Sequence, residues 1–104
     1  MPSYHVYFSP KSETSDSELI DKCHSFLGDL IANHQIQSYR LIRITNPASF
    51  PALPKFQLIV DYCSQQQLDG SFAFMKDSNR ITSPPHGLII PLVSDFKVAF
   101  SEDV

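Results

Sequence analysis

The sequence has no tryptophan, three glycines and two cysteines among its 104 residues. The three glycines lie far apart and form no GxGxxG or P-loop pattern, which excludes a glycine-rich loop that cradles a phosphate. The GxSxG pattern of a nucleophile elbow does not occur either. Cys23 and Cys63 form no CxxC pair and share no ligand spacing with the four histidines. We therefore predict reduced thiols, no structural metal and no cofactor.

Basic residues are also few, and they are scattered. Eight lysines and arginines stand against eleven acidic residues, giving a net charge of −3, and no two basic residues are adjacent. A nucleic-acid surface needs clustered basic side chains, so no nucleic-acid partner is expected. No run approaches the ~18–20 apolar residues of a membrane span, and the first residues do not show the pattern of a signal peptide. We expect a cytoplasmic protein without a membrane partner.

What the sequence does contain is enough apolar material for one core. Its 42% hydrophobic content and its length predict a single domain over residues 1–104. Alternating or β-branched segments predict strands at residues 4–8, 36–45, 56–62 and 88–100, the last interrupted near Pro91. Capping spacings at Ser15/Glu18 and Ser64/Gln67 begin two helices, and Asn33 and His34 end the first. Loops are expected over 47–54 and 77–87 because both contain prolines.

The order strand, helix, strand, strand, helix, strand is the βαββαβ arrangement of the ferredoxin-like α+β fold. It predicts a four-stranded antiparallel sheet with both helices on one face. The face covered by the helices is expected to carry Val6, Phe8, Phe56, Leu58, Val60, Val98 and Phe100. The other face is expected to carry His5, Tyr7, Gln57, Ile59, Asp61, Lys97 and Ala99, with either Arg40, Ile42 and Ile44 or Tyr39, Leu41 and Arg43.

That second face is too apolar to be left in water. A patch of this kind is seldom exposed on a monomer, and packing against a second copy would cover it. The patch would comprise Tyr7, Ile42, Ile44, Ile59 and Leu92. The sequence therefore predicts a homodimer that associates through the sheet face.

The polar side chains on this face are the candidates for chemistry. His5 can exchange protons near neutral pH, Tyr7 can donate to an oxygen, and Asp61 can orient an imidazole. We take these three as the candidate catalytic residues. Arg40 or Arg43 can bind a carboxylate, and His86, in the loop over 77–87, can cover the mouth of a pocket. With Gln57, these residues are the ligand-binding candidates. The alternative for His5, Tyr7, Asp61 and the arginines is a structural role, in a buried polar network or in ion pairs at the sheet edge. The alternative for His86 is an exposed loop position without a role.

Three segments, YHVYF, IQSYRLIRI and KFQLIVDY leading into QQLDGSF, resemble a small bacterial family of uncharacterised proteins. That family has the dimeric α/β-barrel form of the ferredoxin-like fold. The chain departs from its pattern at two positions, where Ser38 replaces a glycine and Gln57 replaces a histidine. Broader relatives include monooxygenases, isomerases, decarboxylases and haem-degrading enzymes. The resemblance implies a homodimer, with ligands held inside the barrel or between the sheet and the helices.

Three functions remain open on the sequence. The first is a homodimer that binds a small ligand or has a structural role. The second is a small cofactor-independent enzyme of the monooxygenase or isomerase type that uses His5 and Tyr7, helped by Asp61 and one arginine. The third is a subunit that docks on another protein through the loop PASFPALP at residues 47–54. Fold alone does not separate them.

Overall fold

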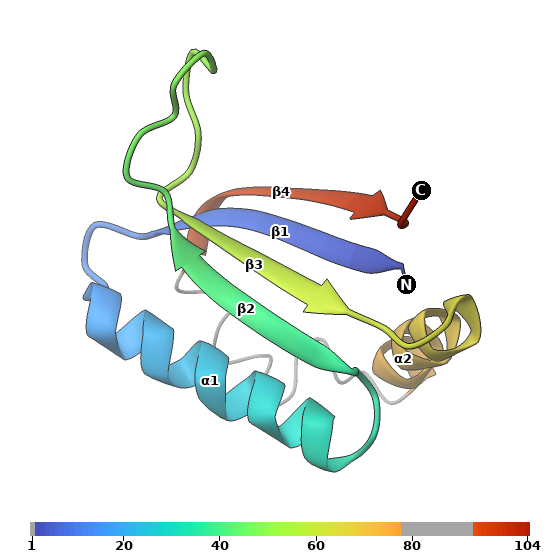
Figure 1. The fold of residues 1–104 in the computed structure, drawn as a ribbon. Helices are drawn as coiled ribbons and strands as arrows, with labels where there is room; N and C mark the ends of the chain where they lie inside the picture. Colours follow the sequence, from blue (N-terminus) through green and yellow to red (C-terminus); the bar gives the residue numbers. More distant parts are fainter. Residues whose placement is uncertain (1, 78–92) are drawn as a thin grey trace.

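The computed structural model describes residues 2–77 and 93–104, and its four strands form one antiparallel sheet in the order β2-β3-β1-β4 (Figure 1). The elements follow the chain as β1 (Ser3–Pro10), α1 (Asp16–Ala32), β2 (Ser38–Arg43), β3 (Phe56–Asp61), α2 (Gln65–Asp77) and β4 (Val93–Ser101). This is the ferredoxin-like α+β fold that the periodicities predict. Of the predicted last strand, residues 88–92 lie outside the described residues, as does His86.

Helix α1 begins and ends where its terminal groups find hydrogen-bond partners. The Ser15 hydroxyl accepts a hydrogen bond from the Glu18 backbone N–H at 3.2 Å, which confirms the predicted N-cap. At the other end His34 adopts a left-handed conformation with φ of 58°. The N–H groups of His34 and Gln35 donate to Ile31 O and Leu30 O, at 3.0 and 2.9 Å. This is a Schellman arrangement, and it turns the chain toward β2.

Helix α2 is tied to the same turn. The Gln67 backbone N–H donates to the Ser64 hydroxyl at 3.1 Å, so Ser64 caps this helix as predicted. The Gln67 side chain accepts from the Cys63 N–H at 2.7 Å and donates to the carbonyl of His34 at 3.1 Å. One side chain therefore links the start of α2 to the end of α1.

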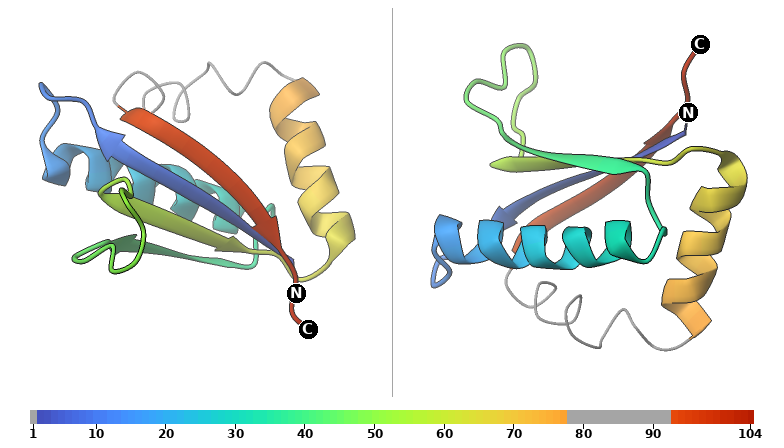
Figure 2. Two further views of the ribbon diagram at one scale, coloured as in Figure 1. Left: turned by 90° about the horizontal axis from the view of Figure 1, so that it is seen from above. Right: turned by 60° about the horizontal axis from the view of Figure 1, so that its bottom comes forward.

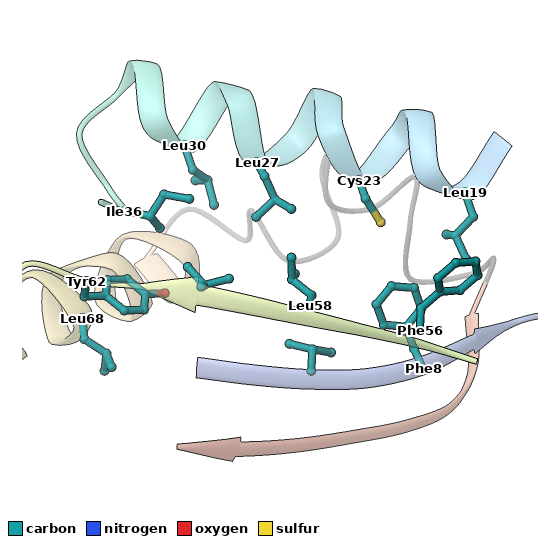
Figure 3. Packing of buried hydrophobic residues seen from close by; sticks show 12 residues of the cluster. Phe8, Leu19, Cys23, Leu27, Leu30, Ile36, Phe56, Leu58, Tyr62 and Leu68 are labelled. Carbon is teal, nitrogen blue, oxygen red and sulfur yellow. The ribbon is translucent and has the colours of Figure 1, made fainter. Parts of the chain in front are cut away.

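The core lies between α1 and the sheet (Figure 3). Leu19, Cys23, Leu27 and Leu30 point from α1 onto the sheet, where Phe8 and Phe56 stack with their ring centroids 5.9 Å apart. Leu68 brings α2 into the same cluster. Among the seven residues predicted on the covered face, five are buried: Val6, Phe8, Phe56, Leu58 and Val60.

Two of the seven differ from that expectation in burial. Val98 and Phe100 are paired with Val6 and Tyr4, which places them on the helix side of the sheet, but they remain 47% and 59% exposed. The physical reason is the strand order, because β4 is an edge strand. Helix α2 reaches it through the contact of Phe72 with Phe100, whose ring centroids are 5.7 Å apart.

Candidate functional site

Register decides which side chains share a face, because directly opposed residues of antiparallel strands point to the same side. The side without helices, here called the open face, carries three rows that run from β2 to β4. The first row is Ser38, Asp61, Ser3 and Ser101. The second is Arg40, Ile59, His5 and Ala99. The third is Ile42, Gln57, Tyr7 and Lys97.

His5, Gln57 and Tyr7 form a connected hydrogen-bond network on the open face. The Gln57 amide nitrogen lies 3.3 Å from His5 Nδ1 and donates to the Tyr7 hydroxyl at 3.2 Å. His5 Nε2 lies 2.8 Å from the Ser101 hydroxyl. All three side chains of the network are half-buried. The structure thus brings together three of the predicted site residues, taken from two neighbouring strands.

This pattern assigns roles to the two nitrogens of His5. The amide group of Gln57 has two N–H donors, one for the Tyr7 hydroxyl and one for His5 Nδ1. Because an amide N–H only donates, Nδ1 accepts in this contact, and Nε2 is then the ring nitrogen that donates to the Ser101 hydroxyl. Among the described residues, the Tyr7 hydroxyl has no second partner, so its own hydrogen is available to an acceptor above the sheet.

Asp61 lies in the neighbouring row and is held by hydroxyl groups. The Ser3 hydroxyl donates to Asp61 Oδ1 at 2.6 Å, and the Ser38 hydroxyl donates to Oδ2 at 3.4 Å. Each oxygen of the Asp61 carboxylate thus accepts a hydrogen bond from one of these serines. In the structure, Gln57 and Ser101 orient the His5 imidazole, whereas the sequence suggested that Asp61 has this role.

The register also separates the two candidate arginines. Arg40 is opposite Ile59 and so lies on the open face, whereas Arg43 is opposite Phe56 on the helix side. The guanidinium of Arg43 lies 5.5 Å from the centre of the Phe56 ring and 3.8 Å from Asp16 at the start of α1. Within residues 2–77 and 93–104, Arg40 is paired with no carboxylate. Arg40 is thus a cation of the open face that can serve a ligand, whereas Lys97 on the same face is paired with Asp95.

Sequence reasoning missed one contributor, Ser101. Its position two residues after Ala99 places it on the open face, and strand alternation could have identified it. The alternation of Phe96, Val98 and Phe100 predicts a strand that ends at Phe100, one residue before Ser101. In the structure β4 extends to Ser101, which is paired with Ser3.

A second group of aromatic residues lies on the helix side, at the end of the sheet nearest α2. The ring of Tyr4 lies 5.1 Å from that of Phe72 and 5.0 Å from that of Phe100. Burial raises the pKa of the Tyr4 hydroxyl. Burial also raises the pKa of Tyr62, against a hydrogen bond with Ser71 that lowers it. Both hydroxyls therefore stay neutral, and they pack as part of the core.

The two cysteines differ in accessibility, which gives a first testable prediction. Both are free thiols; Cys23 is buried, and Cys63 is exposed. Burial raises the pKa of Cys23 to about 11, so its reactive thiolate form is scarce at mildly alkaline pH. We expect iodoacetamide to add one group to the folded protein, at Cys63, and a second only in denaturant. Peptide mass spectrometry checks this, and rapid labelling of Cys23 in the folded protein would contradict it.

Two findings bound the site. Among the described residues, no three His, Cys, Asp or Glu side chains lie close enough together to hold a metal ion. No helix in the described part of the chain is long and apolar enough to cross a membrane.

The sheet order, with both described helices on one face and no described element over the other, defines a protein of the ferredoxin-like α+β class. The chain belongs to a family of unknown function, DUF6614, whose model matches residues 1–103. This confirms the resemblance of the sequence to an uncharacterised family. No curated protein matches the chain.

Solved structures with the same fold come from several organisms. A protein of Arabidopsis thaliana is 7% identical, with a TM-score of 0.77 and coverage of 100% of this chain and 96% of its own. A protein of Jannaschia sp., described as dimeric and ferredoxin-like, is 14% identical, with a TM-score of 0.68 and coverage of 99% and 100%. One of Thermobifida fusca with the same description is 12% identical, with a TM-score of 0.61 and coverage of 96% and 88%.

Proposed function

We propose that the protein is a homodimer that packs two open faces together and binds a small molecule between them. The observation that carries the proposal is the network of His5, Gln57 and Tyr7 on the open face, which ends in a tyrosine hydroxyl that has no further partner among the described residues. Polar networks of this kind are costly inside an interface unless every member is satisfied. A bound ligand would supply the missing partner.

The apolar residues of the open face support association. Tyr7, Ile42 and Ile59 are half-buried within one protomer, and among the described elements both helices lie on the other side of the sheet (Figure 2). A second copy is the simplest cover, because a two-fold axis lets each face meet its own equivalent. The Jannaschia and Thermobifida proteins are described as dimeric, which supports this choice.

The polar groups of the open face indicate the chemistry of the ligand. Tyr7 offers an O–H donor, and Arg40, two strands away from His5 in its row, offers a cation. Both groups suit an oxygen acceptor such as a carbonyl or carboxylate. We therefore propose a small organic molecule that carries such an oxygen.

The alternative is a small cofactor-independent enzyme that uses His5 as a general base. A general base needs a free lone pair directed at the substrate. In His5 the Nδ1 lone pair faces Gln57, and Nε2–H faces Ser101. This arrangement favours a binding role for the imidazole over a catalytic one.

Native mass spectrometry of the freshly purified protein tests the proposal. We expect a dimer that retains an added mass of a few hundred daltons. Tyr7→Phe removes the free hydroxyl, and we expect it to leave the dimer intact while at least a tenfold smaller share keeps the added mass, about 1.4 kcal/mol of binding. The matched control is Tyr39→Phe, whose hydroxyl lies on the helix side, 2.8 Å from His24 Nδ1.

The outcomes separate the two parts of the proposal. A dimer without added mass would overturn ligand binding and leave the association standing. A monomer would overturn both. A dimer in which Tyr7→Phe and Tyr39→Phe lose the added mass equally would move the site away from the open face.

A cytoplasmic location, a bacterial source and the lack of nucleic-acid or membrane partners stay predictions. The net charge of −3 supports the exclusion of nucleic acid.

A further inference from the structure

The connection between β2 and β3, residues 44–55, stands out from the body of the protein on the side of the open face. In Figure 1 it rises from the ends of β2 and β3 while α1 lies below the sheet. Figure 2 shows the same relation in both further views, with the loop on one side of the sheet and α1 on the other. Whatever covers the open face must therefore lie beside this loop.

The base of the loop is fixed to the sheet. The Ile44 N–H donates to the carbonyl of Lys55 at 2.8 Å, and the Lys55 N–H donates to the Ser9 hydroxyl at 2.9 Å. Pro54, next to Lys55, is buried. The loop consequently leaves the sheet in a defined direction.

The tip of the loop is also held in one shape. The Ala48 N–H donates to the Asn46 side-chain oxygen at 2.9 Å, and the Phe50 N–H donates to the Pro47 carbonyl at 3.1 Å. Ala48 adopts a left-handed conformation with φ of 55°, which is unfavourable for a residue with a Cβ. Prolines at 47, 51 and 54 restrict the backbone further. A loop held in this way loses little freedom when it binds.

The loop presents an aromatic ring to solvent. Phe50 is 61% exposed, the highest exposure of any large hydrophobic residue in the described part of the chain apart from the terminal Val104. The segment from Asn46 to Pro54 has no charged residue. Charged residues are depleted at the centres of protein interfaces, and aromatic residues are enriched there.

We propose that the loop at residues 44–55, here called the arm, contacts the second copy of this chain. Phe50 would pack against the partner, beside the partner's open face. The inference rests on the proposed homodimer and adds the residue that closes the end of the site. The loop emerges next to the row of Ile42, Gln57 and Tyr7, since β2 ends at Arg43 and β3 begins at Phe56. In a two-fold dimer both arms act in the same way, one at each end of the shared site.

The first test is the strength of the dimer. We expect Phe50→Ala to raise the dimer dissociation constant at least tenfold in a dilution series followed by light scattering, with an unchanged circular dichroism spectrum. Ile31→Ala is the matched control, because Ile31 is an exposed apolar residue on α1, 40% exposed and on the helix side. It should leave the dissociation constant unchanged.

The second test uses the absence of tryptophan. Phe50→Trp places the single tryptophan of the chain at the tip of the arm, where excitation at its red edge separates it from the four tyrosines. We expect its emission to be blue-shifted in the dimer and to move to the red on dilution, as the ring enters water. The corresponding variant Ile31→Trp should emit at the red end at every concentration.

The results distinguish this inference from the proposed function. If the wild type is a dimer while Phe50→Ala binds as tightly as the wild type and Phe50→Trp emits in the red, the arm is overturned and the dimer stands. If the wild type is monomeric at every concentration, both are overturned.

Discussion

Phe56→Ala is expected to lower the free energy of unfolding by about 3–5 kcal/mol, the range for removing a fully buried phenylalanine. Phe56 is 2% exposed, stacks on Phe8 and lies under Leu19 (Figure 3). Arg43 and Lys55 also pack over its ring, at 5.5 and 5.9 Å from the centroid. A loss of this size is a large share of the stability of a domain, which is about 5–15 kcal/mol.

Urea unfolding followed by circular dichroism measures this loss. Phe96→Ala is the matched control, since Phe96 is the same residue type but 51% exposed on β4. We expect the control to cost less than about 1 kcal/mol, in keeping with a surface substitution. Equal losses in the two variants would show that the core is not centred on the Phe8–Phe56 pair.

Ile59→Asp is expected to dissociate the proposed dimer. Ile59 lies in the middle of the open face, between Arg40 and His5 in its row. In a two-fold interface the substitution acts twice, placing two carboxylates where apolar surface was buried. We expect the dissociation constant to rise at least a hundredfold, about 2.7 kcal/mol, in sedimentation equilibrium.

Ile31→Asp makes the same chemical change on the exposed side of α1 and should leave association unchanged. Circular dichroism spectra of both variants establish that the fold is retained. A dimer of wild-type strength in Ile59→Asp would place the interface elsewhere on the protein and remove the basis for a shared ligand site.

The fold could be predicted well from the sequence because its elements carry strong local signals. Ser15 and Ser64 cap the helices as their spacing indicated. The alternation of Phe56, Leu58 and Val60 matches burial in β3, where these residues alternate with half-buried ones. Local hydrogen bonding and periodicity are sufficient for such features.

The candidate site could be predicted less well from the sequence, because the pairing register of the strands decides which side chains share a face. A shift of one residue moves every side chain of a strand to the other face, and β2 carries an arginine on each. Only pairing with β3 places Arg40 above the sheet and Arg43 below it. The hydrogen-bond partners of His5 are Gln57 on β3 and Ser101 at the end of β4, which lie 52 and 96 residues away in the sequence. No pattern within a short segment can therefore predict them.

The central place of β1 has a consequence for synthesis of the chain. Both neighbours of β1 come later, β3 from Phe56 and β4 from Val93. At about 5–20 residues per second, the ribosome needs about 2–6 s to pass from the end of β3 to the start of β4. During that time one edge of β1 has no strand to pair with, and open strand edges invite aggregation. A nascent chain that stalls before β4 therefore exposes an edge of β1 that the complete sheet covers.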